Sequence, residues 1–276
     1  MVDDLAAAYP LRTVVSVGGD LAQTLPWTGS TEGAPIVRVA VVSDVHGNLV
    51  ALQAISLELK RASPDLIVHG GDLAAIGPRP AEVLDFIRDA GWAGVIGNTD
   101  EMLFDTSARA EQEAGAPKLK PWLKILFDVL APWAFERLSL DHVTWLRALP
   151  THWQSHRMTL VHAAPDDLWR APMPDARDAE LRQVYGSLGG DLAVYGHIHR
   201  PYVRHLGDLI VANSGSGGLP YDGDPRVSYL LIDGSSAEVR RVEYDLEKAA
   251  RDAVAAGFPF ADWLAEVQHQ ARFRMP

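Results

Sequence analysis

The stretch VRVAVVSDVHGN at residues 37–48 decides the fold of this chain. Its apolar first half, Val37–Val42, is typical of a strand buried on both faces of a parallel sheet. Its second half is polar and leads directly into Leu49–Arg61, where apolar residues recur at helical spacing. The stretch therefore predicts the first strand, turn and helix of an α/β fold.

The same alternation continues for about fifty residues. Leu66–Val68 has the pattern of a second buried strand, Pro80–Asp89 that of a helix with proline in its first turn, and Ala93–Ile96 that of a third strand. Strands that alternate with helices at this spacing are parallel and joined by right-handed crossovers. In such sheets, ligands bind at the carboxyl ends of the strands.

Short polar segments follow these predicted strands and two later ones. They are Asp44-Val45-His46, Gly71-Asp72, Gly97-Asn98, His162 and Gly196-His197-Ile198-His199. A random sequence of this composition would contain only about 0.03 matches to Gly-His-x-His, so the set is not accidental. Together the segments offer seven oxygen and nitrogen side chains, which suit two divalent metals sharing one carboxylate. Two metals about 3.5–4 Å apart are a device for hydrolysing phosphate esters.

The rest of the chain adds helices and a second group of strands. Residues 101–149 have helical spacing with a break at 115–117, and we interpret them as a helical cap whose aromatic stripe packs in the core. The later predictions are a strand at Met158–His162, a helix at Asp178–Leu188, a strand at Leu192–Tyr195, antiparallel strands of a second sheet up to Val242, and a C-terminal helix at 246–273 interrupted near Gly257.

Composition excludes several classes of function. The chain has 276 residues, no cysteine and a net charge of −11, which excludes thiolate metal sites and argues against binding long nucleic acids. No apolar run is long enough to span a membrane, and the first residues are acidic where a signal peptide is basic. We therefore expect a cytoplasmic protein. We expect its substrate to be a small phosphorylated molecule, and the sequence leaves open whether the protein forms a homo-oligomer.

Residues 1–35 have the composition of an N-terminal extension outside the main fold. They contain Gly18-Gly19-Asp20, which repeats the wording of Gly70-Gly71-Asp72. The earlier copy precedes the first predicted strand and lacks the expected helix after it. We therefore assign chemistry to Asp72 and none to Asp20.

The order and spacing of the polar segments resemble the calcineurin-like metallophosphoesterase superfamily, in its bacterial phosphodiesterase branch. The resemblance covers residues 36–245. It implies an α/β fold in which two mixed sheets form a four-layer α/β/β/α sandwich, as one domain over residues 36–276 with a helical insertion. It also implies that Asp44, His46 and His199 bind a first metal, that Asn98, His162 and His197 bind a second, and that Asp72 bridges them.

The resemblance further implies hydrolysis by a metal-bound hydroxide, with Asp72, Asn98 and His162 as catalytic ligands. Imidazole suits transition metals better than calcium. We expect manganese first, with iron, zinc, nickel, cobalt and magnesium as alternatives.

One position departs from the family. Many members have histidine after the Gly-Asn pair, and that histidine is thought to protonate the leaving group, whereas this chain has Thr99. Threonine cannot deliver a proton at neutral pH, so hydrolysis of phosphoserine is disfavoured and phosphodiesters with better leaving groups stay open. His69 or Asp100 could supply a substitute acid, but a structural role is the expected alternative for each.

Two further residues are candidate substrate contacts. Asn48 could support the site or cap the following helix, and Arg200 could contact a phosphate or form a surface ion pair. The loop at residues 213–218 resembles a family loop, and we interpret it as packing beneath the metals.

Three hypotheses follow for function. The first is a dimetal phosphoesterase, preferably a phosphodiesterase. The second, within the same class, is a nucleotide-polyphosphate hydrolase or phosphomonoesterase. The third is a non-catalytic binding scaffold of the same fold, which the retention of all seven ligands disfavours.

Overall fold

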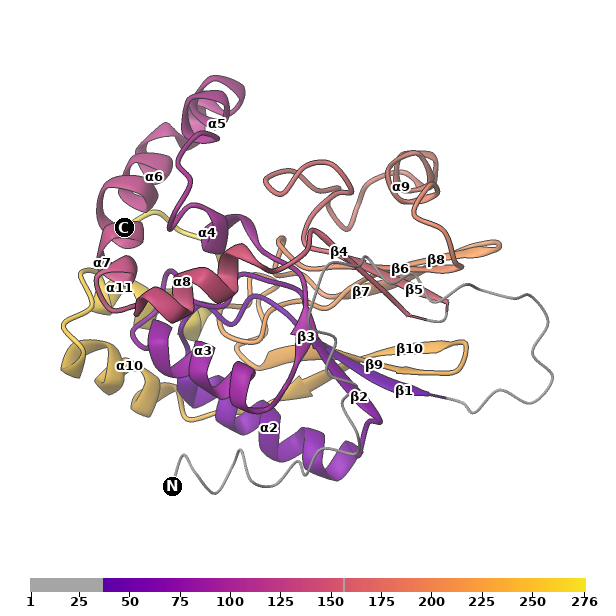
Figure 1. The fold of residues 1–276 in the computed structure, drawn as a ribbon, viewed down its shortest axis with the longest axis horizontal. Helices are drawn as coiled ribbons and strands as arrows, with labels where there is room; N and C mark the ends of the chain where they lie inside the picture. The colour runs from indigo at the N-terminus through magenta and orange to yellow at the C-terminus, as the bar shows by residue number, and fades with distance from the viewer. Residues whose placement is uncertain (1–36, 156) are drawn as a thin grey trace.

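Two five-stranded mixed sheets face each other in the computed structural model, which describes residues 37–155 and 157–276 (Figure 1). In the first sheet β1 and β2 are parallel, β2 and β3 are parallel, and β9 runs antiparallel to β1. Its strands, in spatial order, are β10 (Ser236–Val242), β9 (Val227–Asp233), β1 (Arg38–Val42), β2 (Leu66–His69) and β3 (Ala93–Gly94).

The second sheet repeats this mixture. β5, β6 and β8 are parallel neighbours, and β4 and β7 add antiparallel edges. Its strands, in spatial order, are β4 (His152–Ser155), β5 (Met158–Val161), β6 (Leu192–Tyr195), β8 (Leu209–Asn213) and β7 (Tyr202–Leu206). The carboxyl ends of the parallel strands of both sheets are therefore available to build one site.

Helices cover the outer faces and one end of the sheet pair. The α-helices are α2 (Leu49–Ala62), α3 (Pro80–Asp89), α4 (Asn98–Glu101), α5 (Arg109–Gly115), α6 (Lys120–Ile125), α7 (Ala131–Phe135), α8 (Leu140–Arg147), α9 (Asp178–Tyr185), α10 (Leu246–Ala255) and α11 (Ala261–Gln270). A 3₁₀ turn, η1 (Pro117–Leu119), and a π-helical turn, η2 (Leu126–Leu130), lie within the α5–α7 segment. Its break falls at residues 115–117, where the sequence predicts it.

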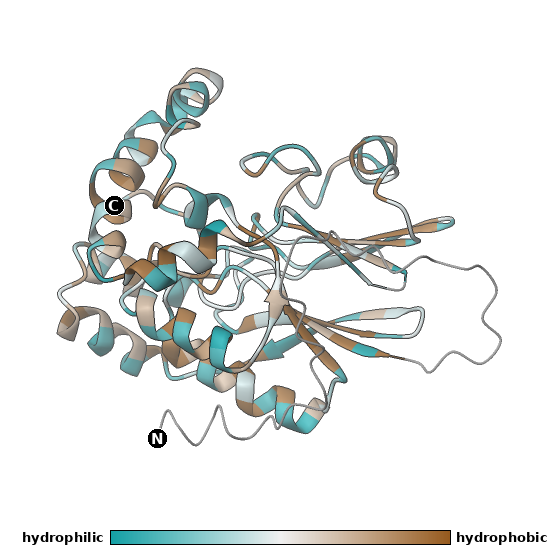
Figure 2. Ribbon diagram, in the orientation of Figure 1, coloured by the Kyte–Doolittle hydropathy of each residue, from teal (hydrophilic) through white to brown (hydrophobic). Residues whose placement is uncertain are grey.

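Alternation along β1 shows how one strand serves two cores. Val39 and Val41 belong to the core between the sheets, together with residues of the second sheet such as Leu160. Ala40 and Val42 point the other way, into the core beneath the helices. Figure 2 shows the strands as largely hydrophobic and the outer helices as mixed.

The layers confirm the predicted four-layer α/β/β/α sandwich. α2 and α3 pack on the outer face of the first sheet, and α9 packs on that of the second through Leu181 and Tyr185 (Figure 1). The predicted aromatic stripe of the cap is core, since Trp122, Leu126 and Leu130 are all buried.

The placement of one predicted hairpin is wrong. The sequence pattern predicts that the strands up to Val242 belong to the second sheet. In the structure β9 and β10, which meet at the Asp233–Gly234 turn, belong to the first sheet, where β9 pairs with β1. A strand pattern reports burial and not the neighbour, so the sequence could not place this hairpin. The C-terminal helix is two helices, separated near Gly257 as expected.

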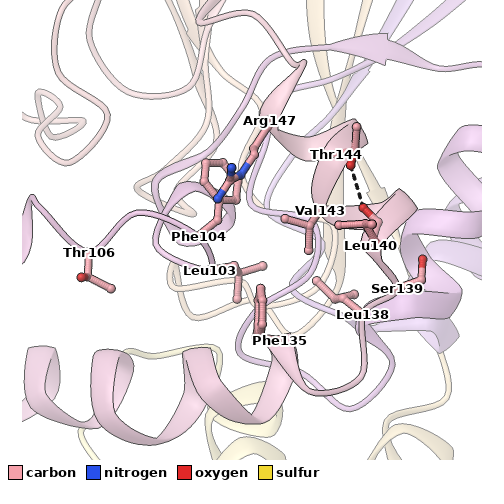
Figure 3. A pocket seen from close by; sticks show the side chains of 10 residues that line it. All are labelled: Leu103, Phe104, Thr106, Phe135, Leu138, Ser139, Leu140, Val143, Thr144 and Arg147. Atoms are coloured by element: carbon pink, nitrogen blue, oxygen red, sulfur yellow. Dashed lines mark hydrogen bonds between the residues drawn. The ribbon is translucent and has the colours of Figure 1, made fainter.

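A hollow of about 590 Å³ lies between the segment after α4 and helices α7 and α8 (Figure 3). Its walls include Phe135 and Leu140, which are 46% and 80% exposed. No predicted metal ligand lines it. Across the described ranges, no helix is both long and apolar enough to cross a membrane. The predicted extension at residues 1–35, with Asp20, lies outside the described part of the chain.

Candidate metal centre

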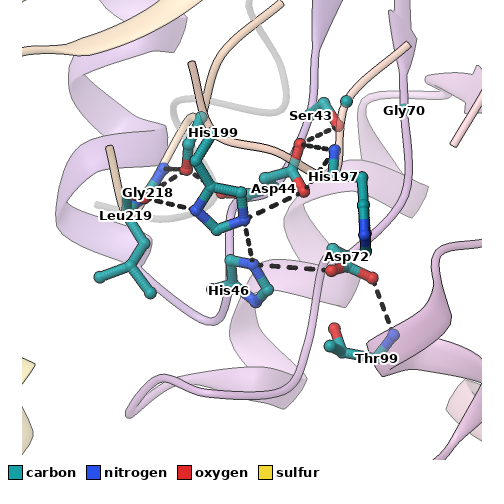
Figure 4. A network of polar contacts seen from close by, with 12 residues as sticks. Ser43, Asp44, His46, Gly70, Asp72, Thr99, His197, His199, Gly218 and Leu219 are labelled. Atoms are coloured by element: carbon teal, nitrogen blue, oxygen red, sulfur yellow. Dashed lines mark hydrogen bonds and ion pairs between the residues drawn. The ribbon is translucent and has the colours of Figure 1, made fainter. Parts of the chain in front are cut away.

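All seven predicted ligands meet at one place. Two follow β1, one follows β2, one begins α4 just after β3, one follows β5 and two follow β6. Their carboxylate and imidazole atoms form two groups: one of Asp44, His46, Asp72 and His199, and one of Asp72, His162 and His197. Within each group the atoms lie within 4.8 Å of one another. Figure 4 shows the first group, with His46 between Asp72 on one side and His199 and Asp44 on the other.

Asp72 belongs to both groups through different oxygens. Its Oδ2 lies 3.7 Å from Nε2 of His46, in the first group, and its Oδ1 lies 3.5 Å from Nε2 of His162, in the second. The side chain is almost fully buried, and the backbone N–H of Thr99 donates to Oδ1 at 2.9 Å. One carboxylate thus presents one oxygen to each group, which is the arrangement expected of a bridging ligand.

Asn98 completes the second group with a neutral oxygen. Its Oδ1 lies 2.9 Å from Nε2 of His162 and 3.0 Å from Nδ1 of His197. The donors of the second group are therefore one carboxylate, one amide oxygen and two imidazoles. This mixture suits a divalent transition metal better than calcium.

Backbone carbonyls fix the tautomer of every histidine in the site. Nδ1 donates to Ala75 O at 2.9 Å in His46, to Gly70 O at 2.7 Å in His162, and to Leu219 O at 2.5 Å in His199. In His197 the donor is Nε2, which lies 3.0 Å from Trp169 O. Because a carbonyl can only accept, the nitrogen facing it carries the proton, and in the neutral form of each ring the other nitrogen has the lone pair and faces the centre.

These lone pairs converge. Nε2 of His46 and Nε2 of His199 lie 3.1 Å apart, although neither carries a proton when Nδ1 does. A cation between such groups turns their mutual repulsion into ligation. The donor set and its orientation therefore fit two metal ions. The group that contains Asp44 would hold one, and the group that contains Asn98 would hold the other.

The backbone is strained where the ligands lie. In the described residues, eight residues other than glycine have a positive φ, and five of them are predicted ligands. They are Asp44, His46, Asp72, His197 and His199, with φ between 49° and 64°. Left-handed backbone at residues other than glycine is costly and clusters at functional sites.

Small neighbours hold the carboxylates in place. The Ser43 hydroxyl donates to Asp44 Oδ2 at 2.5 Å, and the backbone N–H of His197 donates to the same carboxylate. A side chain at Gly97 would overlap the Asp72 carboxylate, and one at Gly196 would overlap Asp44. The glycines of the Gly-Asn and Gly-His motifs are therefore needed for close approach.

Burial and neighbouring charges shift the pKa values of the predicted ligands in different directions. Burial would raise the pKa of Asp44, but His199, with His162 and His46, outweighs burial and holds that pKa well below its usual range. Burial lowers the pKa of His46, and burial with the nearby His162 lowers that of His197 to about 4. At His162 burial would lower the pKa, but the nearby carboxylates of Asp72 and Asp44 outweigh burial, and the pKa is raised. Buried anions and neutral imidazoles are the forms that bind metals.

The candidate acids have different surroundings. The Asp100 carboxylate accepts from the backbone N–H groups of Leu73 and Ala74, so it braces the loop that follows Asp72. Burial, and then the nearby Asp72, raises the pKa of Asp100 to about 7. His69 is fully buried beside Trp145, and burial lowers its pKa to about 3.

The two candidate substrate contacts, Asn48 and Arg200, do not line the cavity that opens over the metal ligands. Asn48 is buried and caps α2: its Oδ1 accepts from Ala51 N, and its Nδ2 donates to Gly218 O. Arg200 is exposed, and its Nε donates to Tyr221 O at 3.2 Å. The capping alternative for Asn48 therefore agrees with the structure.

The loop at residues 213–218 packs beneath the ligands, as we interpreted it. The Ser216 hydroxyl donates to Asp44 O at 2.6 Å, and Gly217 N donates to Ser43 O at 2.7 Å. Asn213 Nδ2 donates to Gly196 O at 2.6 Å. These contacts fix the backbone on both sides of the first group.

A cavity of about 480 Å³ opens over the ligands. Five of the seven predicted ligands line it, as does Thr99, whose hydroxyl has no hydrogen-bond partner in the described structure. Sequence reasoning missed Gln112, Trp169 and Arg170, which form part of its wall. These residues lie in the cap and in the loop at residues 165–173. Neither segment contains a sequence motif that would have identified them.

Comparison with known proteins supplies the family. The model of the calcineurin-like phosphoesterase superfamily domain matches residues 37–237. An uncharacterised protein of Methanocaldococcus jannaschii is 29% identical over 83% of this chain and 96% of its own length. A phosphodiesterase of Escherichia coli is 24% identical over 74% of this chain and 91% of its own.

The chain is also similar to a tetraphosphatase in sequence and to a metallophosphoesterase in structure. A symmetrical bis(5′-nucleosyl)-tetraphosphatase of Pectobacterium carotovorum is 30% identical over 61% of this chain and 59% of its own length. The crystal structure of a metallophosphoesterase from Sphaerobacter thermophilus superposes with a TM-score of 0.69 at 24% identity, over 86% of this chain and all of that one. With the matched domain and the paired ligand groups, this chain belongs to the calcineurin-like phosphoesterase superfamily.

Proposed function

We propose that this protein is a dimetal-dependent phosphodiesterase acting on a small phosphorylated substrate. The observation that carries the proposal is the position of Asp72, which turns one oxygen toward each of two donor groups. Two divalent cations bound there would activate a water nucleophile and offset the negative charge of the phosphoryl group. We propose manganese as the metal and the cytoplasm as the compartment.

The chain's own residues have separate tasks in this proposal. Asp44, His46 and His199 would hold one ion, Asn98, His162 and His197 would hold the other, and Asp72 would serve both. The carbonyls that accept from the four imidazoles fix the orientation of each ring, so that in the neutral ring the other nitrogen faces the centre. No serine or other nucleophile of the chain is required.

The wall of the cavity favours a diester over a phosphoserine-like monoester. The side chain nearest the place of the family's acid is Thr99, which can donate a hydrogen bond to a phosphoryl oxygen but cannot protonate an alkoxide at neutral pH. Asp100 and His69 are buried and held away from this wall by their own contacts. A substrate with a good leaving group needs no acid.

Charge also disfavours a polyphosphate. Among the residues that line the cavity, the one cationic side chain apart from histidine is Arg170. It already lies 3.4 Å from Glu111 and 3.9 Å from Asp167. A chain of several phosphates would need more cations than this to offset its charge. The polyphosphate hydrolase is thus the second candidate, supported by the tetraphosphatase relative.

The test compares manganese-loaded protein on bis(p-nitrophenyl) phosphate, p-nitrophenyl phosphate and phosphoserine. We expect turnover of the diester to exceed that of phosphoserine, and we expect Asp72→Ala to abolish it. Equal turnover of diester and phosphoserine would favour the phosphomonoesterase. A protein that binds two metals but hydrolyses none of the three phosphate esters would favour the non-catalytic scaffold.

A further inference from the structure

The wall of the cavity above the ligands carries one guanidinium and, beside it, one buried amide. We propose that Arg170 and Gln112 bind a carboxylate on the organic part of the substrate, so that the substrate is a phosphate ester with a second, singly charged anionic group. The inference rests on the proposed function for the position of the phosphate at the metal ligands. It adds the chemical class of the organic group, which the metal ligands do not specify.

The charge of this wall is opposite to that of the chain as a whole. The chain carries a net charge of −11, from 36 acidic and 25 basic side chains. Among the described residues that line the cavity, Asp72 is the one acid, and it is a predicted metal ligand. Arg170 is the one cation apart from histidine. The wall above the ligands is therefore suited to an anion.

The backbone of Arg170 is fixed relative to the metal centre. The carbonyl of the preceding residue, Trp169 O, accepts from Nε2 of the predicted ligand His197 at 3.0 Å. The backbone N–H groups of Trp169 and Arg170 donate to Asp167 Oδ1 at 2.7 and 3.1 Å. The loop is thus held by a predicted ligand and by its own turn. A side chain on a fixed backbone loses less conformational entropy when it binds a ligand.

The guanidinium of Arg170 reaches from this loop to helix α5 of the cap. Its Nη2 lies 3.4 Å from Glu111 Oε1, and a Cβ atom at Gly115 would lie only 2.7 Å from the same nitrogen, so the glycine leaves room for it. Gln112 is three residues before Gly115, on the same face of the helix. Among the described residues, the ion pairs of Arg170 are with Glu111 and Asp167 and with no predicted ligand. The group that reaches this guanidinium is therefore not the phosphate at the metals.

Gln112 presents a buried amide to the same cavity. The residue is 8% exposed and lines the cavity wall. Its backbone groups bond to Ala108 and Ala116, whereas its side-chain amide forms no hydrogen bond with the residues that the structure describes. Buried polar side chains are nearly always paired, so an unpaired amide at a cavity wall points to a ligand. The N–H groups of an amide can donate to a carboxylate oxygen.

The ion pair between Arg170 and Glu111 is weak enough to exchange. The two side chains are 53% and 72% exposed, and pairs of this kind contribute little to stability. A carboxylate inside the cavity would accept charge-assisted hydrogen bonds from the same guanidinium, which are stronger than neutral ones. One guanidinium and one neutral amide offset one negative charge. They therefore select a carboxylate over a second phosphate monoester, whose charge is about −2 at neutral pH.

The experiment is calorimetric titration of the manganese-loaded full chain with phosphonoacetate and its longer homologues up to 6-phosphonohexanoate. Alkylphosphonates of the same chain lengths are the reference, because they carry the phosphonate and lack the carboxylate. A phosphonate is not hydrolysed, so binding is measured apart from turnover. At one or more lengths we expect the carboxylate to bind about 5- to 50-fold more tightly, the gain from hydrogen bonds to a charged group less the loss of the pair with Glu111. Equal affinities at every length would overturn the inference.

Substitutions in the wall locate the carboxylate. Arg170→Gln should remove most of the preference for the carboxylate, and Gln112→Leu should reduce it about 2- to 5-fold. Glu111→Gln should increase it about 2- to 5-fold, because the guanidinium is freed from a competing carboxylate. Arg182→Gln is the matched control and should keep the parent preference, since its side chain is similarly exposed, 46% against 53%, and pairs with Asp208 outside the cavity. Alkylphosphonates should bind all four variants as they bind the parent.

The outcomes separate the two proposals. Diester hydrolysis with equal affinities for phosphonocarboxylates and alkylphosphonates would leave the proposed function standing and reject the carboxylate site. A carboxylate preference that Arg170→Gln removes, in a protein that hydrolyses no ester, would support the carboxylate site and reject the proposed function. An equal loss of the preference in Arg170→Gln and Arg182→Gln would reject the location.

Discussion

Asp72→Asn is the substitution that separates a bridging carboxylate from an ordinary buried one. Asparagine has the same shape, and its Oδ1 can still accept the hydrogen bond that Thr99 N now gives at 2.9 Å. What is lost is one negative charge shared by two groups whose nearest histidine nitrogens lie 3.5 and 3.7 Å away. The fold should survive, and the metals should not.

The size of the effect follows from Coulomb's law. At an effective dielectric constant near 20, a unit charge about 4 Å from another is worth ~4 kcal/mol, and about twice that against a doubly charged ion. Desolvation of the buried carboxylate returns a large part of this. A net loss of about 3–4 kcal/mol is expected, which weakens metal binding about 10²- to 10³-fold.

The assay is metal retention against a graded series of chelator concentrations, read by elemental analysis, with thermal unfolding to verify the fold. Asp208→Asn is the matched control, because its side chain is 89% exposed and, among the described residues, forms an ion pair only with Arg182. Wild-type retention of both metals by Asp72→Asn would refute the bridging role. Equal losses in the two variants would show that the effect is not specific to the site.

Three further predictions follow from particular contacts. Thr99→His should raise turnover of alkyl esters more than that of aryl diesters, because only poor leaving groups need a proton; rates measured across leaving groups of different acidity test this, and a uniform change would contradict it. Asn48→Ala should lower the free energy of unfolding by about 2 kcal/mol, since it removes a helix cap and leaves a buried carbonyl unpaired; urea unfolding measures it, and a loss below about 0.5 kcal/mol would contradict the assignment. On acidification, His162 should protonate before His46 and His197, because its pKa is raised and theirs are lowered, so the second group should release its metal first; elemental analysis against pH would show one ion lost before the other, and simultaneous loss would contradict it.

The sequence predicted the first half of the fold because its signals are local. The strand pattern at Val37–Val42 matches β1 within one residue, and the predicted bounds of α3 are those observed. The same reasoning missed β4, whose residues His152–Ser155 are short and alternate between exposed and half-buried positions. It also misplaced the β9–β10 hairpin, because nothing local says that β9 pairs with β1.

The ligands were predictable for a related reason, and their surroundings were not. The motifs follow strand ends, and parallel strands bring those ends to one edge, so the sequence could predict that they meet. The carbonyl of Trp169 that orients His197, and the loop that carries it, depend on tertiary contacts alone. The positive φ angles at five ligands are likewise invisible in the sequence, which suggests only that glycines stand beside them.

Anomalous X-ray scattering from crystals of the manganese-loaded protein tests the central claim most directly. The account predicts two peaks per chain, one on each side of Asp72, with Asp44, His46 and His199 around one and Asn98, His162 and His197 around the other. A single peak, or two peaks that do not share Asp72, would contradict it.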